Sequence, residues 1–395
     1  MKQKLEADYA PRVSCSLAEI ILLDQYSGLG GGQRILMDLA RAFRNGGHVV
    51  RVLVPGTGSA GRSLADEAFT VLPLPLPDMT AGRKTLFEKA AYPLRARRAA
   101  KSIEAAIARR RADLIYANAP RCFLPAVLAA RRTGVPVACA LHLIFTGGME
   151  HRLIRWCFRQ PEVKRVIFCS SSVAAPFAGA AGSKSEKLHY WVSPAFLEAE
   201  KDRAAAREVL GLRGFDVAVG VLGRISRTKG QRMFLEALVP LLDSHPRLKL
   251  FVAGAADFED PGEDAIVRAL SERAADRDRV VVTGTMVESM PFLDALDVLV
   301  VPSLWEEPFG LVAVEGMARR LPVVVTRSGG LTEIVEHGVT GLHVDKTAAA
   351  LRAAVASLVE DPVLRANMGD AGRARVEAMF NPSRQIALLM EKSLG

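Results

Sequence analysis

Short apolar runs of four to seven residues alternate with helical patterns along nearly the whole chain. Such alternation is typical of βαβ units, in which helices cover a parallel sheet. In the first half, the runs expected to form strands are Ile20–Leu23, Val49–Val54, Leu114–Ala117, Val135–Leu141 and Val166–Cys169. In the second half they are Val217–Leu222, Leu248–Ala253, Val280–Thr283, Val298–Val301 and Val323–Thr326. The pattern therefore predicts one open α/β sheet in each half.

The length of the chain, 395 residues, is ordinary for two domains and long for one. The segment 191–214 interrupts the rhythm of strands with a Ser-Pro dipeptide, a charged helical pattern and a glycine turn. We expect two doubly wound Rossmann-like domains, over 1–195 and 215–380, joined by a linker over 196–214. A final helix over 381–395 would pack across either domain. Ligands of open α/β sheets bind at the carboxyl ends of the strands, so we expect the function in a cleft between the domains.

Composition excludes several classes of protein. No uncharged apolar run approaches the roughly 20 residues that a helix needs to cross a bilayer. The cysteines are odd in number and lack CxxC spacing, which favours neither a disulfide framework nor structural zinc: they are Cys15, Cys122, Cys139, Cys157 and Cys169. We expect a cytoplasmic protein, with attachment to the cytoplasmic face of a membrane as a further hypothesis.

That hypothesis comes from the uneven distribution of charge. Residues 1–195 carry 28 Lys and Arg against 14 Asp and Glu, whereas residues 196–395 carry 24 against 29. Within the basic half, Arg83–Arg111 contains ten cationic and two acidic side chains, interleaved with apolar residues. Such a stretch can lie on an anionic bilayer. The alternative is the solvated face of two helices that pack on the sheet through Leu86, Ala90, Leu94, Ile103 and Ile107. Nucleic acid is disfavoured because neither an aromatic stacking pattern nor a recognised nucleic-acid motif accompanies the basic cluster.

The most informative motif is SLWEEPFGLVAVEGMARRLPVVVTRSGGLTEIVEHGVTGLHV, from Ser303 to Val344. A helix is expected to begin at Glu307–Pro308, because proline is favoured at the first helical position. The backbone N–H groups of Phe309, Gly310 and Leu311 would then form an anion site at the helix N-terminus. Glu315 is the only charged residue from Pro308 to Ala318 and would need a partner in an otherwise buried helix.

Two carboxylates eight residues apart on one helix would lie about 12 Å apart along its axis. Glu307 and Glu315 would then reach opposite ends of one elongated ligand. This separation disfavours a glycosidase pair, whose carboxyl groups lie roughly 5–9.5 Å apart.

Two further motifs supply groups that suit phosphate. VGVLGRISRTKG, from Val219 to Gly230, presents Arg224 and Lys229 after a buried strand, and two cations at a strand end suit a diphosphate. DQYSGLGGGQRILMDL, from Asp24 to Leu39, leads from the first strand through a glycine-rich loop into an amphipathic helix. This loop can hold a phosphate or allow close approach between domains.

These motifs in combination resemble the retaining glycosyltransferases of family 4, which have the GT-B fold, and the resemblance spans nearly the full length. It implies that Arg224 and Lys229 bind the donor diphosphate, that Glu307 lies by the donor sugar and that Glu315 holds the nucleotide ribose. Backbone N–H groups of Phe309, Gly310, Leu311 and Val312 would contact sugar hydroxyls and phosphate. Gly31 and Gly32 would close over the phosphate, and His142 matches the family position near the sugar. No metal and no cofactor is implied, since cations and helix dipoles would stabilise the leaving diphosphate.

Each of these residues also has a purely structural interpretation. Glu315 and His142 can be satisfied core residues, Arg224 and Lys229 solvated cations, and the glycine loop a flexible turn. Asp276-Arg-Asp278 has the DxD form of other glycosyltransferases, but its position at a helix end disfavours a metal site.

The resulting hypothesis is transfer of a sugar, with retention, from a nucleotide diphosphate donor to a saccharide or lipid-linked acceptor hydroxyl, in the synthesis of envelope polysaccharide, lipopolysaccharide or glycolipid. A phosphorylase that uses inorganic phosphate and a catalytically silent nucleotide-sugar-binding subunit are the alternatives. A Rossmann oxidoreductase is disfavoured because no acidic residue ends the second strand, which runs into Val54-Pro55-Gly56.

Overall fold

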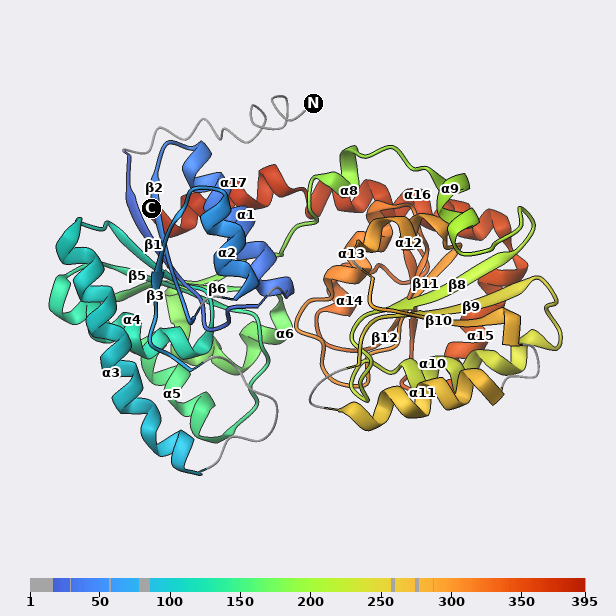
Figure 1. Cartoon of the computed structure of the whole chain (residues 1–395), viewed down its shortest axis with the longest axis horizontal. Helices are drawn as coiled ribbons and strands as arrows, with labels where there is room; N and C mark the ends of the chain where they lie inside the picture. Colours follow the sequence, from blue (N-terminus) through green and yellow to red (C-terminus); the bar gives the residue numbers. More distant parts are fainter. Residues whose placement is uncertain are drawn as a thin grey trace. The chain divides into compact units, whose positions relative to one another are not determined.

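The computed structural model describes residues 17–28, 30–56, 58–77, 86–256, 260–273, 277–286 and 288–394. The chain divides into two compact units (Figure 1). Unit 1 combines the residues before Trp191 with those after Pro382, and unit 2 is Trp191–Pro382. The division falls a few residues before the boundary expected at 195, and the final helix shares unit 1 with the first half of the chain.

Unit 1 is built on a parallel sheet with the order β3-β2-β1-β4-β5-β6-β7 among the described residues. The interior strand β1 pairs with β2 on one side and β4 on the other, with Ile20 opposite Val50 and Leu114. The strands are β1 Glu19–Leu23, β2 Val49–Val54, β3 Thr70–Pro73, β4 Leu114–Ala117, β5 Val137–Leu141, β6 Val163–Phe168 and β7 Ser185–Lys187. The order of the strands reverses between β1 and β4. The carboxyl ends of β1 and β4 are therefore a position where open α/β sheets bind ligands.

Helices cover both faces of this sheet in Figure 1. The helix α1 begins directly after the glycine-rich loop and buries one side through Ile35, Leu36, Leu39 and Phe43, as its amphipathic sequence predicts. The α-helices of unit 1 are α1 Gly31–Asn45, α2 Ser59–Asp66, α3 Leu86–Arg109, α4 Pro120–Thr133, α5 Gly148–Arg159, α6 Ser171–Ala174, α7 Ala178–Ala181 and α17 Pro382–Leu394. Short 3₁₀ turns occupy Ala175–Phe177 and Gly182–Lys184.

Unit 2 has a second parallel sheet, with the order β10-β9-β8-β11-β12-β13 in the described part of the chain. Its strands are β8 Val217–Leu222, β9 Leu248–Ala253, β10 Val280–Gly284, β11 Val298–Val301, β12 Val323–Thr326 and β13 Gly341–Val344. Because β8 and β11 are neighbours, the loops that follow them meet at the same edge of the sheet. This pairing places the two charged motifs of the second half together.

The helices of unit 2 also form two layers. In Figure 1, α12, α13 and α16 lie on one face of the sheet, and α10, α11 and α15 lie on the other. The α-helices are α8 Ala195–Glu198, α9 Arg203–Val209, α10 Gln231–Leu238, α11 Pro261–Arg273, α12 Ser289–Ala295, α13 Leu311–Ala318, α14 Leu331–Ile334, α15 Ala348–Glu360 and α16 Pro362–Met379. Short 3₁₀ turns occupy Val239–Leu242 and Arg277–Arg279.

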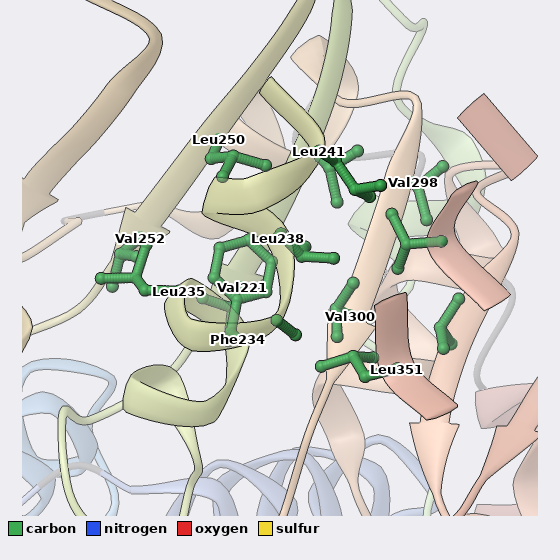
Figure 2. Packing of buried hydrophobic residues seen from close by; sticks show 14 of the residues in the cluster. Val221, Phe234, Leu235, Leu238, Leu241, Leu250, Val252, Val298, Val300 and Leu351 are labelled. Atoms are coloured by element: carbon green, nitrogen blue, oxygen red, sulfur yellow. The ribbon is translucent and has the colours of Figure 1, made fainter. Parts of the chain in front are cut away.

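One hydrophobic core of unit 2 lies between the sheet and the helices α10 and α15 (Figure 2). Phe234 and Leu238 of α10 pack against strand residues such as Val221 and Val300, and all four side chains are buried. A fully buried Leu or Phe contributes about 1.5–3 kcal/mol relative to an exposed one. This layer fixes β8 and β11 side by side and so holds the loops at their carboxyl ends.

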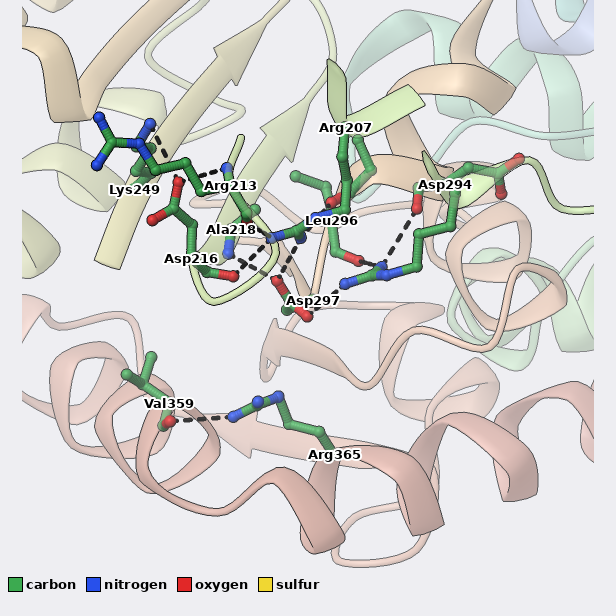
Figure 3. A network of polar contacts seen from close by, with 12 residues as sticks. Arg207, Arg213, Asp216, Ala218, Lys249, Asp294, Leu296, Asp297, Val359 and Arg365 are labelled. Carbon is green, nitrogen blue, oxygen red and sulfur yellow. Dashed lines mark hydrogen bonds and ion pairs between the residues drawn. The ribbon is translucent and has the colours of Figure 1, made fainter. Parts of the chain in front are cut away.

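The segment 196–214, expected as a linker, belongs to unit 2. Its helix α9 is held to the unit by Arg207, which is buried and donates to Asp297 Oδ2 at 3.1 Å and to the carbonyl oxygen of Asp216 at 2.7 Å. Figure 3 shows this network, in which Asp297 also accepts from the backbone N–H of Ala218 at 2.8 Å. The charged pattern that we interpreted as a linker is therefore a helix attached by ion pairs.

Three strands absent from the predicted set are β3, β7 and β13. Each lies at the edge of its sheet. Edge strands are short and tolerate polar residues, as in the Ser-Glu-Lys sequence of β7, so they lack the apolar run by which a central strand is recognised. No helix in the described residues combines the length and the apolar character that a bilayer span requires.

Candidate functional site

The loop after β8 carries the two cations expected to bind phosphate. Arg224 is exposed, and Lys229 is half-buried just before the start of α10. Gln231, which is fully buried, fixes this loop by donating from Nε2 to the carbonyl oxygens of Gly223 at 3.3 Å and Arg224 at 2.9 Å. The backbone turns sharply at Gly223, whose φ is 149°. The sequence placed both cations correctly at the carboxyl end of β8 but did not identify Gln231, which positions them.

Glu307 is the centre of a compact polar cluster at the carboxyl end of β11. Its side chain is buried, and Oε2 accepts from Lys229 Nζ at 2.7 Å and from Ser303 Oγ at 3.0 Å. Trp305 Nε1 donates to the same oxygen at 3.2 Å. The Lys229 ammonium also lies 5.6 Å from the centroid of the Trp305 ring. The structure thus brings together two predicted residues and adds Ser303 and Trp305, two residues of the same motif that were not predicted as site residues.

The helix after this cluster begins later than predicted. The expected start was Glu307–Pro308, whereas α13 begins at Leu311 and Gly310 occupies the N-cap position with φ of 106°. The carbonyl oxygen of Glu307 accepts from the backbone N–H of Gly330 at 2.7 Å, outside any helix. Glu307 and Pro308 therefore form a loop, and the axial separation of Glu307 and Glu315 inferred for a single helix is wrong.

Two glycines explain why this loop forms. A Cβ at Gly329 would lie 2.2 Å from the carbonyl oxygen of Glu307, and one at Gly330 would lie 2.6 Å from that of Pro308. Only residues without a side chain allow this close backbone approach, which the Ser-Gly-Gly of the sequence motif supplies. Phe309 anchors the same loop by packing edge-on against Phe380, at 6.0 Å between ring centroids.

The start of α13 presents backbone donors as expected, shifted by a few residues. Leu311 and Val312 occupy the first helical positions, where N–H groups have no acceptor within the helix. The helix is largely buried through Ala313, Val314 and Met317, as its sequence predicts. Glu315 is only partly buried, so the expected fully buried carboxylate is not found.

A second carboxylate, that of Glu306, lies beside Glu307 but has different partners. Lys346 Nζ donates to Glu306 Oε1 at 2.9 Å, and the backbone N–H of Gly329 donates to Oε2 at 2.7 Å. The hydrogen bond from Lys346, with the weaker one from Gly329, lowers the pKa of Glu306. Glu306 is exposed and connects two loops. Of the two adjacent carboxylates, Glu306 therefore has a structural role and Glu307 a candidate functional role.

In unit 1 the glycine-rich loop ends at α1. Gly31 and Gly32 form its first turn, after Gly30 in extended conformation at the N-cap. A Cβ at Gly32 would lie 3.1 Å from Nε2 of His142, which follows β5. The structure therefore places the predicted residues Gly32 and His142 side by side.

His142 differs from an ordinary core histidine. Burial lowers its pKa to about 4, which keeps the imidazole neutral near pH 7. Its Nδ1 is buried without a hydrogen-bond partner among the described residues. Buried polar atoms are normally paired, so an unpaired one beside a helix N-terminus is consistent with a ligand contact.

Asp24 and Asn118 hold the glycine-rich loop and were not predicted as site residues. Asn118 Nδ2 donates to Asp24 Oδ2 at 2.7 Å and to the carbonyl oxygen of Gly32 at 3.2 Å. Gln33 Nε2 donates to Asp24 Oδ1 at 2.9 Å. All three polar side chains are buried, and burial raises the pKa of Asp24 despite these hydrogen bonds. A polar residue directly after each of β1 and β4 was the available sequence signal.

Comparison with known families matches both units. The profile described as "Glycosyl transferases group 1" matches residues 202–375, and the profile described as "Glycosyl transferase 4-like domain" matches residues 30–191.

Among curated proteins, the chain is 34% identical over 163 residues to the putative glycosyltransferase YtcC of Bacillus subtilis, covering 40% of each chain. It is 29% identical over 259 residues to the lipopolysaccharide core biosynthesis mannosyltransferase LpsB of Rhizobium meliloti, covering 64% of this chain and 72% of that one. It is 36% identical over 176 residues to the D-inositol 3-phosphate glycosyltransferase of Segniliparus rotundus, covering 44% and 39%. The match thus spans less than half the length of two of these three relatives.

Solved structures share the fold over nearly the whole chain. Anabaena HepE in complex with UDP has a TM-score of 0.81 at 22% identity, covering 94% of this chain and 98% of that one. WaaG, a glycosyltransferase involved in lipopolysaccharide biosynthesis, has a TM-score of 0.69 at 17% identity, covering 94% and 99%.

Proposed function

Because the chain belongs to the group 1 and family 4-like glycosyltransferases with the GT-B fold, we propose that it transfers a sugar, with retention, from a nucleotide diphosphate donor to an acceptor hydroxyl. The observation that carries the proposal is the contact between Lys229 and Glu307 at the carboxyl end of the unit 2 sheet. At this edge the ammonium of Lys229 suits the negatively charged diphosphate of the donor, and the carboxylate of Glu307 suits hydrogen bonds from the hydroxyls of its sugar.

Each group has a role that its chemistry supports. Arg224 and Lys229 bind the diphosphate, since guanidinium and ammonium groups suit phosphate oxygens. The N-terminus of α13, at Leu311 and Val312, adds backbone donors and the positive end of a helix dipole. Glu307 accepts hydrogen bonds from the sugar, and Glu315 from the nucleotide ribose. Fixed positive groups stabilise the charge that develops on the leaving diphosphate, so the proposal includes no metal.

The other substrate-binding groups lie in unit 1. Gly31 and Gly32 allow the donor phosphate to approach the backbone at the start of α1, while neutral His142 contacts the sugar. Support for the acceptor class comes from named relatives, one a lipopolysaccharide core mannosyltransferase and another a D-inositol 3-phosphate glycosyltransferase. The proposed acceptor is a saccharide or glycolipid of the cell envelope.

A thermal-shift series with UDP, GDP, ADP and their sugar conjugates tests the donor site. A ligand at 100 times its Kd stabilises the native protein by about 2.7 kcal/mol. We expect one nucleotide class to raise the melting temperature of the wild type and not of the Arg224→Ala variant. Arg227→Ala, an exposed cation on the same loop, is the matched control and should keep the shift.

The outcomes separate the proposal from its rivals. Transfer of sugar from the stabilising donor supports a glycosyltransferase. Phosphate-dependent sugar release without nucleotide would instead identify a phosphorylase. Donor binding without transfer or hydrolysis across a panel of acceptors would identify a silent binding subunit. Equal shifts of melting temperature in the wild type and in Arg224→Ala would show that Arg224 does not bind the donor.

We further propose that α3 attaches the protein to the cytoplasmic face of an anionic membrane. Residues 83–85 of the basic run lie outside the described residues, and the rest forms the single helix α3 and a short continuation, where two helices were expected. Leu94, which the alternative of two solvated helices placed against the sheet, is 54% exposed, whereas Ile103 is buried. Arg97, Arg98 and Lys101 share the exposed face of Leu94 by helical spacing.

Sedimentation with vesicles of phosphatidylcholine and phosphatidylglycerol tests this attachment. Each cation near an anionic surface contributes about 1 kcal/mol, so the double variant R97Q/R98Q should bind about 30-fold more weakly. The double variant R232Q/R268Q removes two exposed charges from unit 2 and should bind like the wild type. Equal binding of all three proteins would contradict the assignment of α3.

A further inference from the structure

A pocket of about 220 Å³ lies in unit 2 at the amino ends of β11 and β12. Asp297, directly before β11, and Pro322, directly before β12, both line it. The cluster around Glu307 lies after the carboxyl end of β11, at the opposite edge of the same sheet. This pocket is therefore separate from the candidate donor site.

The charged residues of the lining are mostly cationic, and the others are apolar. Lys201, Arg203, Arg320 and Arg365 all contribute, whereas Asp297 is the only carboxylate. Figure 3 shows Asp297 beside Arg207 and, lower in the view, Arg365 bonded to the carbonyl oxygen of Val359. The lining groups carry a formal excess of three positive charges, which favours an anionic ligand.

The one acidic residue of the lining, Asp297, already has hydrogen-bond partners at both oxygens. Asp297 Oδ1 accepts from Arg203 at 2.7 Å, and Oδ2 accepts from Arg207 at 3.1 Å and from the backbone N–H of Ala218 at 2.8 Å. Two arginines thus share the oxygens of one carboxylate, and Asp297 acts on Lys201 only through its charge, together with Asp294. The acidic residue belongs to the framework that attaches α9.

Two of the cations have neutral partners within the described residues. Lys201 Nζ donates to the carbonyl oxygen of Arg319 at 2.8 Å, and Arg365 donates to that of Val359 at 3.0 Å through one terminal nitrogen. These bonds cap helix C-termini but use only part of the donor capacity of each group. Burial, and next the charge of Arg203, lowers the pKa of Lys201 to about 8. An anion beside Lys201 would offset both effects.

Arg320 adds an independent observation. Its φ is 58°, in the left-handed region, at the end of α13 where glycine is the usual residue. A non-glycine residue there is strained, and retained strain points to a use for the side chain. Arg320 is one of the residues that line the pocket, and its exposed side chain pairs with Asp370.

We propose that this pocket binds a phosphate group, either as free inorganic phosphate or as the phosphomonoester of a small metabolite. Arginine and lysine donors together match tetrahedral phosphate oxygens. The volume is below the roughly 300–1,000 Å³ of pockets for drug-sized ligands, which favours a small anion. The proposal does not depend on the proposed transferase function.

The site lies at one end of a helix whose other end carries candidate donor-binding groups. The helix α13 runs from Gly310, beside the Glu307 loop, to Arg319 and Arg320 at the pocket. A ligand that draws Arg320 and Lys201 together would act on the end of this helix. The site is therefore placed to serve a small phosphorylated effector.

Calorimetric titration with inorganic phosphate and with a hexose 6-phosphate, in a phosphate-free buffer at constant ionic strength, tests the site. We expect saturable binding that weakens at least tenfold in Arg320→Gly and in Lys201→Met. Glycine suits the left-handed backbone at position 320, so the first variant removes a cation without a folding penalty. Arg232→Gln, an exposed cation of unit 2, is the matched control and should bind like the wild type.

The variant Lys229→Met shows which site is titrated. Binding that survives in Lys229→Met but weakens in Arg320→Gly supports the proposal. Binding lost in Lys229→Met and unchanged in Arg320→Gly would place phosphate at the donor site and overturn it, as would no saturable binding. Tighter binding of the hexose phosphate than of inorganic phosphate would identify a phosphomonoester, and the reverse order a free anion. Nucleotide binding by Arg320→Gly tests the donor site separately.

Discussion

The ammonium of Lys229 lies 2.7 Å from Oε2 of Glu307, across 78 residues of sequence. They meet because β8 and β11 are neighbours in the unit 2 sheet, so that the loops after both strands share one edge. Ser303 and Trp305 donate to the same carboxylate oxygen and fix its position. A diphosphate that binds Lys229 therefore acts on a carboxylate whose orientation is already set.

Glu307→Gln should reduce the rate of sugar transfer about 10²- to 10³-fold, the range for removing one preorganised electrostatic group. The amide keeps the size of the side chain but removes the charge that orients Lys229. The measurement is kcat with the donor identified by thermal shift. Glu306→Gln changes the neighbouring exposed carboxylate and should retain near wild-type kcat. Equal loss in both variants would mean that the charge of this loop, and not Glu307, matters.

Gly32→Ala should lower activity while the protein stays folded. The added Cβ would lie 3.1 Å from His142 Nε2, so the imidazole must shift by a few tenths of an ångström or more. Misplacement of a catalytic group by 1 Å can cost about 10²-fold in rate, so we expect a loss of about ten- to a hundredfold. Gly179→Ala meets no atom within 4 Å and is the control in the same unit. Full activity of Gly32→Ala would exclude a close role for His142.

Much of the fold could be predicted from the sequence because central strands are apolar on both faces. β8 and β9 have the predicted bounds, whereas the edge strand β7 is polar and short and gave no signal. The linker was misassigned for a related reason. Arg203 and Arg207 resemble solvated charges in sequence, but both bind Asp297, whose position depends on the folded sheet.

The candidate site was predictable in its parts and not in its connections. The motifs located Arg224, Lys229 and Glu307 at strand ends, which follows from βαβ order. The loop at Glu307 could not be predicted, because it depends on the backbone N–H of Gly330, at the other side of the β12 strand in the same motif, donating to the carbonyl oxygen of Glu307. For the same reason Asn118, which holds the Gly32 carbonyl 86 residues away, carried no recognisable motif.

His142 should titrate far below the range of an ordinary histidine. Burial lowers its pKa in the folded state to about 4, against about 6.5 in the unfolded chain. His142 therefore makes its full contribution to the free energy of unfolding above pH 6.5. This contribution falls by on the order of 3 kcal/mol as the pH decreases toward 4, because the unfolded chain then binds a proton that the folded protein does not. Urea unfolding at pH 7 and pH 4.5 should show a smaller loss of stability in His142→Gln than in the wild type. An NMR midpoint near 6.5 for the His142 ring would contradict the buried, neutral state.

The buried pair of Arg319 and Asp294 should be among the most sensitive structural elements of unit 2. Arg319 donates to both carboxylate oxygens, at 2.6 and 2.8 Å, and the two side chains are 2% and 7% exposed. Asp294→Ala would leave a buried guanidinium without its counter-charge, which typically costs 3–5 kcal/mol.

Arg319 also donates to the carbonyl oxygens of Phe196 and Ala199, so the loss of its partner should loosen the segment 196–200 together with the C-terminus of α13. Urea unfolding measures the change in stability, and hydrogen exchange of 196–200 locates it. Glu236→Ala removes one member of an exposed pair on α10 and should leave both readouts nearly unchanged. If the free energy of unfolding of Asp294→Ala equals that of Glu236→Ala, the carbonyl oxygens around Arg319 satisfy the guanidinium without the carboxylate. The ion pair would then not be the contact that holds the segment 196–200 to the rest of unit 2.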